Sequence, residues 1–399
     1  MDKKQTKIKL AERMYRLPPY IFGELNALKL KKRQEGIDII DLGMGNPDQP
    51  SLKNVVDKLA EVASRDSKTH RYSRSRGLPH LLKAAADKYK KVWDVKLIPD
   101  DEIIATIGSK EGVSHLALAL LGPGDSALVP TPAFPIHVWS VILAGANVIQ
   151  IELGDMNSFM TRLAHVVENL WPKPKVLYLN FPHNPTTAVV EIDFYRDIVK
   201  YCKKHEIIII NDFAYCDITF DGYKSPSILE VEGAKDIAVE FTTMSKSYNM
   251  AGWRVGFCAG NKEIINALGR LKGYYDYGIF TPIQVASIVA LREPHQKVEE
   301  IAKIYEQRRD VFVEGLNKGG WNIEKPKATM FIWAPIPEQY KSMGSVKFAY
   351  MLMEKAEVCA TTGISFGESG DGFIRLALVE NSNRLQQAVK QINRALKII

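Results

Sequence analysis

Residues 207–217 read IIIINDFAYCD, in which an apolar run of isoleucines is followed by two polar residues, Asn211 and Asp212. Runs that are apolar throughout are typical of strands covered on both faces. Longer helix-like stretches separate this run from similar ones at 103–107, 126–130, 147–153, 175–180, 237–243 and 255–260. Because strands that alternate with helices indicate crossover units, the sequence predicts an α/β fold with a mainly parallel, seven-stranded sheet.

The two ends of the chain lack this rhythm. Residues 285–399 begin with a long, charged helical pattern that stops at a Lys-Gly-Gly sequence, and residues 1–50 contain no comparable series of apolar runs. We therefore expect a large domain at 51–284 and a smaller α+β domain formed by 1–50 together with 285–399.

The composition is that of a globular protein and excludes several classes. Of the 399 residues, 46% are hydrophobic and 25% are charged, and the formal net charge of +7 is not gathered into a basic stripe, so we expect no nucleic-acid partner. The four cysteines are scattered, which argues against a disulfide framework or a zinc site and favours a reducing compartment. We expect no metal. We also expect no membrane segment and a cytoplasmic location, because the first residues contain no apolar leader region and no apolar run reaches membrane length.

Ligands of open parallel sheets bind outside the carboxyl ends of the strands, so the residues that follow each strand are candidates for a site. After 103–107 comes GSKEG, in which Gly108 and Ser109 open a helix. A glycine turn at a helix N-terminus presents free N–H groups to a phosphate, although many such turns are purely structural.

Three further strand ends carry polar residues. FPHNPTT contains Asn184, DFAYCD contains Asp212 and Tyr215, and MSKSYNMAGWRVGF contains Lys246 and Arg254. Taken alone, the asparagine suits a turn, the aspartate a helix cap or an ion pair, and the lysine a solvated loop. A lysine among apolar neighbours and other cations, however, has a lowered pKa and becomes a nucleophile and base.

Together these strand ends match the needs of one cofactor. Pyridoxal phosphate requires an amine for its aldehyde, a carboxylate for its pyridine nitrogen, donors for its ring oxygen and anion contacts for its phosphate. The nucleotide alternatives fail, because GMGNPD at 43–48 lacks the third glycine of a dinucleotide fingerprint and the chain contains no P-loop motif.

The motifs SKSYNMAGWRVGF, NPT, DFAY and FIRLALVEN, in this order and spacing, resemble those of class I/II aminotransferases of the fold type I pyridoxal-phosphate enzymes. The resemblance covers essentially the whole chain. Through RLPPYIF, DLGMGNPD and GSKEG it is greatest to bacterial glutamate–pyruvate (alanine-forming) aminotransferases, and it is weaker to aspartate and LL-diaminopimelate aminotransferases. It implies an exchange of the amino group between an L-amino acid and a 2-oxo acid.

The resemblance also assigns roles to residues. Lys246 is the Schiff-base lysine and general base, Asp212 is the partner of the pyridine nitrogen, and Tyr215 and Asn184 donate to the ring oxygen. Phosphate contacts are implied for the turn at Gly108 and for Ser109, Lys110, Thr243, Ser245 and Arg254, with Tyr72 reaching the phosphate of the neighbouring subunit of a homodimer with shared sites. Phe134 stacks on the ring. The substrate residues are Arg375 for the α-carboxylate, Gly45, Asn184 and, lining the pocket, Tyr20.

Two positions depart from the family pattern, and the substrate is left open. Thr187 stands where glycine often follows NPT, and Phe134 stands where relatives often have tyrosine. Around YYDYGIFTP, where aspartate-selective relatives have an arginine, the chain has tyrosines and Asp276, which favours alanine and pyruvate with glutamate and 2-oxoglutarate. The alternatives are an aspartate or LL-diaminopimelate aminotransferase, or a β-elimination lyase on the same fold.

Overall fold

The seven apolar runs form one sheet in the computed structural model, which describes residues 8–18, 22–65 and 67–396. The strands are β2 (Ile103–Thr106), β3 (Ser126–Thr131), β4 (Asn147–Glu152), β5 (Val176–Leu179), β6 (Ile208–Asp212), β7 (Ala238–Thr243) and β8 (Gly256–Gly260). Their order is β2-β8-β7-β6-β5-β3-β4. Strand β8 is antiparallel to β2 and to β7, and all the other pairs are parallel. The predicted fold class is confirmed.

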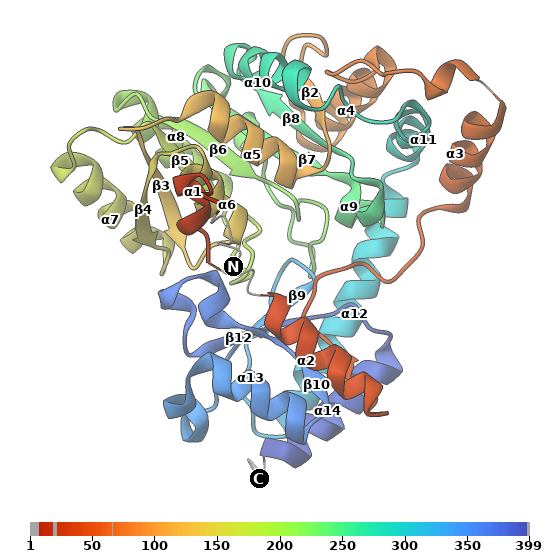
Figure 1. The fold of residues 1–399 in the computed structure, drawn as a ribbon, viewed down its shortest axis with the longest axis vertical. Coiled ribbons are helices and arrows are strands. Elements are labelled where there is room, and N and C mark those ends of the chain that lie inside the picture. Colours follow the sequence, from red (N-terminus) through yellow and green to blue (C-terminus); the bar gives the residue numbers. More distant parts are fainter. Residues whose placement is uncertain (1–7, 19–21, 66, 397–399) are drawn as a thin grey trace, which may run out of the picture.

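Helices cover both faces of this sheet (Figure 1). Successive strand residues point to opposite faces, so Leu177 and Leu179 enter one core whereas Val176 and Tyr178 enter the other. The first core includes α3 (Lys53–Arg65), α4 (Pro79–Trp93), α7 (Met156–Asn169), α8 (Ile192–Lys204) and α11 (Thr281–Arg292). The second includes α5 (Ser109–Leu120), α6 (Pro135–Leu143) and α10 (Lys262–Tyr275).

A smaller lobe contains two further sheets. An antiparallel sheet has the order β11 (Thr361–Thr362), β12 (Phe373–Ala377), β9 (Phe331–Pro335), and β1 (Ile40–Asp41) pairs in parallel with β10 (Val358–Cys359). The helices of this lobe are α2 (Phe22–Gln34), α12 (Gln296–Lys318), α13 (Gly344–Lys355) and α14 (Ser382–Leu396).

A third hydrophobic core lies in the smaller lobe and draws on both ends of the chain. It contains Ile40 and Leu42 as well as residues of α12, β9, β12 and α14. Ala214 and Tyr215, just after β6, belong to it too, so the larger lobe meets this core at the end of its central strand. We propose the domain limits 51–284 for the larger unit and 1–50 with 285–399 for the smaller one.

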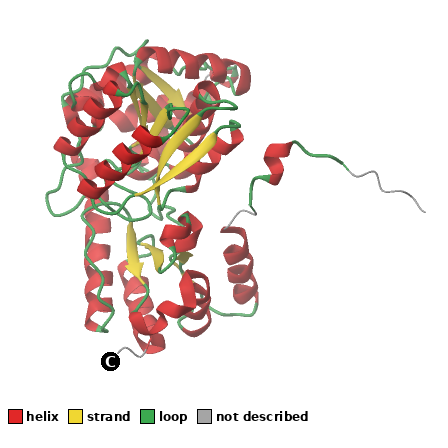
Figure 2. Cartoon of the chain, turned by 90° about the vertical axis from the view of Figure 1, so that its left-hand side faces the viewer, coloured by secondary structure: helices red, strands yellow, loops and turns green. Residues whose placement is uncertain are grey.

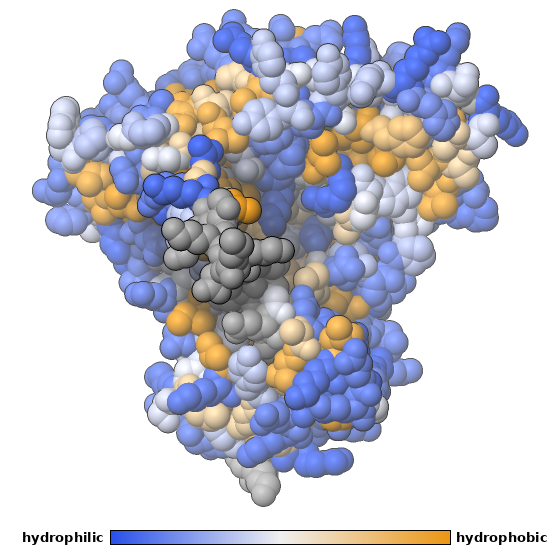
Figure 3. Space-filling view, viewed as in Figure 1, coloured by the Kyte–Doolittle hydropathy of each residue, from blue (hydrophilic) through white to orange (hydrophobic). Residues whose placement is uncertain are grey.

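The remaining elements are short. They are α1 (Glu12–Tyr15), α9 (Met244–Ser247) and the 3₁₀ turns η1 (Ser67–His70), η2 (Ile228–Glu230), η3 (Ala234–Asp236), η4 (Ala251–Trp253), η5 (Glu338–Met343), η6 (Gly363–Phe366) and η7 (Glu368–Gly370). Figure 2 shows α1 standing away from both lobes, and Figure 3 shows apolar residues gathered over α3 and α11. Among the helices of the described ranges, none combines the length and apolarity that a membrane crossing requires.

Candidate active site

A pocket lies where the two lobes meet, at the carboxyl ends of β5, β6 and β7. The strand-end residues come together there because parallel strands end at the same edge of a sheet. Of the residues predicted for the site, those that line the pocket are Gly45, Ser109, Lys110, Phe134, Asn184, Asp212, Tyr215, Thr243, Ser245, Lys246, Arg254 and Arg375.

Asp212 is the last residue of β6 and is buried. Its Oδ2 lies 3.0 Å from Nε2 of His137. Its Oδ1 is also buried, and among the described residues it has no hydrogen-bond partner. Because a buried carboxylate oxygen without a donor is costly, this atom fits a ligand that brings an N–H group of its own.

Lys246 lies in α9, the short turn that follows β7. Its Nζ donates to the carbonyl oxygen of Gly45 at 2.6 Å, across the junction of the lobes. Burial lowers the pKa of Lys246 to about 8, and the positive charges of Arg375 and Arg254 act in the same direction. At this pKa most of the amine is still protonated near physiological pH, but its neutral form, which a nucleophile or base requires, is far more abundant than in an ordinary lysine.

One end of the pocket is built to bind an anion. The helix α5 begins at Ser109 and has no side-chain cap at its N-terminus, and Lys110 and Arg254 line the wall beside it. Gly108 precedes the helix with a φ of 75°, and a Cβ there would lie 2.4 Å from Nη2 of Arg254. Burial, together with Arg254, lowers the pKa of Lys110. Glycine is thus needed at 108 for both conformation and space.

Hydrogen bonds connect Asp212 to the opposite end of the pocket. Asn180 donates to the backbone carbonyl of Asp212 at 2.6 Å and accepts from the N–H of Asn184 at 3.0 Å. The side chain of Asn184 accepts from Nη1 of Arg375 at 2.7 Å, while Nη2 of Arg375 is 3.3 Å from the carbonyl of Gly43. This chain fixes the guanidinium relative to the buried carboxylate.

Tyr215 is buried beside this chain of hydrogen bonds. Burial raises the pKa of its hydroxyl above the ordinary value, against the opposing effect of the Arg375 charge. The hydroxyl therefore stays protonated at neutral pH and remains available as a hydrogen-bond donor.

Two predicted residues do not line the pocket, and a third falls outside the described ranges. Gly108 lies just behind it, against Arg254. Tyr72 is 90% exposed and its ring is 5.4 Å from that of Tyr277, outside the pocket of its own chain. Tyr20 lies outside the described residues.

Sequence reasoning missed several residues of the site, of which His137 and Phe331 matter most. His137, in α6, is three positions after Phe134, the N-cap residue of this helix, and their ring centroids are 6.0 Å apart. That spacing was the available signal. Phe331 lies on β9, far along the chain from every motif, and no signal pointed to it. Besides Phe331, the lining residues that were not predicted are Met44, Asn180, Ala214 and Ala251.

The structure explains the two departures from the family pattern. Thr187 has a φ of 63°, the left-handed region in which glycine is favoured and a β-branched residue is strained. Phe134 lines the pocket, so its ring is available for stacking, without a phenol oxygen. Between them in the chain, His183 bonds through Nδ1 to Oγ1 of Thr186 at 2.7 Å, and burial lowers its pKa to about 3, so it is neutral.

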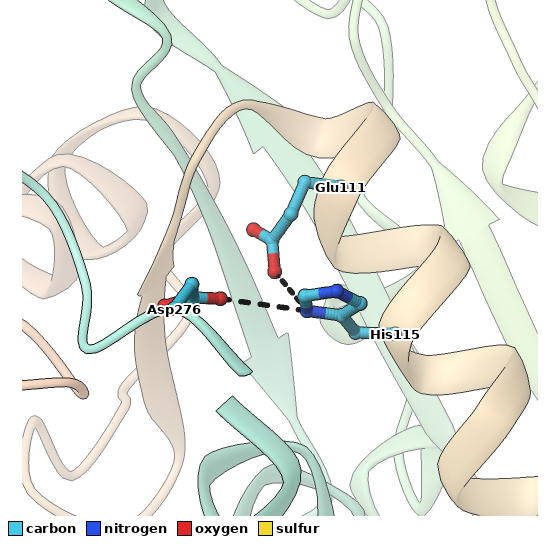
Figure 4. A group of neighbouring side chains, drawn as sticks. All are labelled: Glu111, His115 and Asp276. Carbon is cyan, nitrogen blue, oxygen red and sulfur yellow. Dashed lines mark ion pairs between the residues drawn. The ribbon is translucent and has the colours of Figure 1, made fainter. Parts of the chain in front are cut away.

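Among the described residues, Glu111, His115 and Asp276 lie close enough to share a metal ion (Figure 4). The fully buried ammonium of Lys272 already lies between the two carboxylates. Its Nζ is 3.1 Å from Oε1 of Glu111 and 3.0 Å from Oδ2 of Asp276. Asp276 therefore serves as the partner of a buried lysine and does not line the pocket.

Comparison with known proteins places the chain in one family. The model of the family described as aminotransferase class I and II matches residues 37–392. The glutamate-pyruvate aminotransferase AlaC of Escherichia coli is 49% identical over 95% of this chain and 92% of its own. An LL-diaminopimelate aminotransferase of Moorella thermoacetica is 40% identical over 97% of this chain and 98% of its own.

Solved structures agree with this assignment. The substrate-bound BacF structure from Bacillus subtilis superposes with a TM-score of 0.91 at 34% identity, over 97% of this chain and 98% of that chain. The fold and the pocket define a pyridoxal-phosphate-dependent enzyme that transfers amino groups. The chain belongs to the class I and II aminotransferases.

The pocket residues fit this cofactor. The buried Oδ1 of Asp212 suits the pyridine N–H, the amine of Lys246 suits the aldehyde, and the N-terminus of α5 with Arg254 suits the phosphate.

Proposed function

We propose that this aminotransferase exchanges the amino group between alanine and 2-oxoglutarate, and between glutamate and pyruvate. The observation that carries the proposal is the distribution of charge. The basic side chains among the described pocket residues are Lys110, Lys246, Arg254 and Arg375, and the family resemblance assigns the first three to the cofactor. That leaves Arg375 for the α-carboxylate.

A single cation at the substrate end suits an enzyme that binds both alanine, which has one carboxylate, and glutamate, which has two. An enzyme dedicated to dicarboxylates needs a second fixed cation, which would be left buried and without a partner when alanine binds. Asp276, in the segment where aspartate-selective relatives have an arginine, is bonded to Lys272 instead. The 49% identity to a glutamate-pyruvate aminotransferase supports the same substrates.

The residues then act as follows. When bound, pyridoxal phosphate supplies an aldehyde for the amino group and an electron-withdrawing ring. The neutral form of Lys246 would remove the proton from the substrate Cα and deliver it to the cofactor carbon that receives the amino group. Arg375 binds the α-carboxylate through two parallel hydrogen bonds, which fix the direction of the Cα–H bond. Asp212 keeps the ring nitrogen protonated.

A panel of amino donors and oxo acids assayed on the purified holoenzyme tests the substrate assignment. We expect kcat/KM for alanine with 2-oxoglutarate to exceed that for aspartate by at least about tenfold, since one misplaced polar group costs that much or more. A preference for aspartate or for LL-diaminopimelate would overturn the proposal in favour of those activities. Release of ammonia from one amino acid, without an oxo acid, would identify a lyase.

We also propose a homodimer in which Tyr72 of one subunit reaches the phosphate of the other. The exposed position of Tyr72 and the apolar area over α3 and α11 support this assembly (Figure 3). Mixing inactive Tyr72→Ala and Lys246→Ala subunits should restore part of the activity, because one of the two sites in a mixed dimer is then intact. Mixed dimers without activity would refute shared sites. We assign the enzyme to the cytoplasm, on the basis of four free thiols.

A further inference from the structure

Two phenylalanine rings cover the guanidinium of Arg375. Its Cζ lies over the ring of Phe331, 4.1 Å from the centroid, and over the ring of Phe366, 4.7 Å from the centroid. Both rings are buried, as is Arg375 itself. No motif in the sequence marks either phenylalanine.

The sheet register brings the first ring to this place. In the antiparallel pair of β9 and β12, Arg375 lies opposite Trp333. Phe331 is two residues from Trp333, and therefore on the same face and diagonal to Arg375. Phe366 comes from η6 and meets the edge of Trp333, with ring centroids 5.9 Å apart. Rings from two separate elements thus converge on one cation.

Phe331 also contacts residues of the pocket wall, and Phe366 is bonded to a residue next to that wall. A Cβ on Gly45 would lie 2.5 Å from the ring of Phe331, so the ring fits closely against that glycine. The same ring meets Tyr215 edge-on, with centroids 5.5 Å apart. The carbonyl of Phe366 accepts from the N–H of Ala133 at 2.7 Å, and Ala133 is the neighbour of Phe134.

This arrangement constrains a planar cation. A guanidinium is attracted to the face of an aromatic ring, and the attraction grows when water is excluded. Rings that cover its faces leave only its edges for hydrogen bonds, and those edges already bond to Asn184 and Gly43. The orientation of the fork is therefore set before a substrate carboxylate arrives.

We propose that Phe331 and Phe366 are positioning residues that set the affinity for the substrate α-carboxylate by holding the guanidinium of Arg375. The inference rests on the role of Arg375 in the proposed function. It assigns to the two rings an effect that is common to all substrates, because every amino acid and oxo acid carries that carboxylate.

The test uses propionate, which has the carboxylate of alanine without its amino group, as a competitive inhibitor of the holoenzyme. Phe331→Leu and Phe366→Leu remove each ring and keep an apolar side chain. Each should weaken inhibition about 5- to 30-fold, the range for a desolvated cation over a ring. Phe348→Leu is the matched control: Phe348 is buried in the same lobe, near Trp321 and Tyr340. Cofactor absorbance should be retained in all three.

A double-mutant cycle with Arg375→Lys separates a specific role from loosened packing. Lysine lacks the planar fork, so in that background the leucine substitutions should change the affinity for propionate by less than about twofold. The proposal would be wrong if the losses of propionate affinity from the leucine and lysine substitutions simply added in the double variants. It would also be wrong if Phe331→Leu and Phe366→Leu bound propionate as the Phe348→Leu control does. If Arg375→Lys itself binds propionate normally, Arg375 does not bind the carboxylate. The proposed function of Arg375 and this inference are then both wrong, a result that differs from a failure of the phenylalanine variants alone.

Discussion

Nε2 of His137 lies 3.0 Å from Oδ2 of Asp212, and both side chains are buried. The imidazole can donate to Oδ2 through this nitrogen, and Oδ1 is left without a hydrogen-bond partner among the described residues. His137 therefore orients Asp212 through a bond that does not involve the ligand.

Replacing His137 by alanine should lower kcat about tenfold or more, because Asp212 loses the donor that fixes its plane. His137→Asn, whose amide can donate, should recover part of the loss. Steady-state kinetics with alanine and 2-oxoglutarate measure both, and His165→Ala on the exposed face of α7 serves as the control. Equal activity of His137→Ala and the wild type would show that the carboxylate of Asp212 does not need His137 to hold its orientation.

The lowered pKa of Lys246 leads us to expect that the rate of cofactor uptake depends on pH. Since its pKa is lowered to about 8, the rate at which the cofactor-free protein reacts with pyridoxal should rise with pH and level off above about pH 8. Stopped-flow absorbance records this rate. Arg375→Gln removes a positive charge that lowers the pKa, so its midpoint should move to higher pH. An unchanged midpoint would exclude that electrostatic effect.

The same group affects stability with a definite sign. An unfolded lysine keeps its ordinary pKa of 10.5, so between about pH 8 and 10.5 the unfolded chain binds more protons than the folded, cofactor-free protein. The contribution of Lys246 to the free energy of unfolding therefore rises with pH across that window. Comparing denaturation of the wild type and Lys246→Met at both ends of the window isolates this contribution.

Much of the site was predictable because its parts follow strands. Asp212 ends β6, and Asn184 and Lys246 lie within a few residues of the ends of β5 and β7, so parallel topology alone brings them to one edge. Arg375 required the family resemblance, since β12 lies in the part of the chain without regular strand rhythm. The contacts of His137 and Phe331 depend on helix docking and on the register of a small antiparallel sheet, which no local pattern encodes.

Charge pairing was also hidden from the sequence. Lys272 looks like one of several basic residues on α10, yet its side chain is fully buried. Asp276 was interpreted from its position in the substrate segment, whereas its carboxylate turns towards Lys272. Partners four residues apart on a helix are visible in a sequence, but whether they face solvent or a core is decided by packing.

Thr187→Gly should stabilise the protein. A β-branched residue with a φ of 63° is strained by about 1 to 2 kcal/mol, and the greater freedom of glycine in the unfolded chain offsets only part of that. We expect a small rise in Tm with kcat/KM unchanged within about twofold. Thr186→Gly is the contrasting variant, because the hydroxyl of Thr186 bonds to His183, and it should lower Tm. A lower Tm for Thr187→Gly would mean that its side chain makes a stabilising contact that outweighs the strain.

Lys272→Met should strongly destabilise the larger lobe. The buried ammonium lies within 3.3 Å of both carboxylate groups, of Glu111 and of Asp276, and removing one member of a buried ion pair costs about 3 to 5 kcal/mol. Glu111 also accepts from the N–H of Ile107 at 2.7 Å, just before the glycine turn of the anion site. Cofactor affinity should therefore fall together with Tm.

The same variant converts the cluster into a candidate metal site. Without the ammonium, Glu111, His115 and Asp276 present ligand atoms within 4.8 Å of one another, the set that Zn²⁺ binds with three protein ligands. Zn²⁺ should then raise the Tm of Lys272→Met and leave the wild type unchanged, because an ion that binds only the folded state stabilises it. Adding His115→Ala to Lys272→Met should abolish that rise. An equal rise in the wild type would mean that Zn²⁺ binds elsewhere, and no rise in Lys272→Met would mean that the carboxylates separate once their cation is lost.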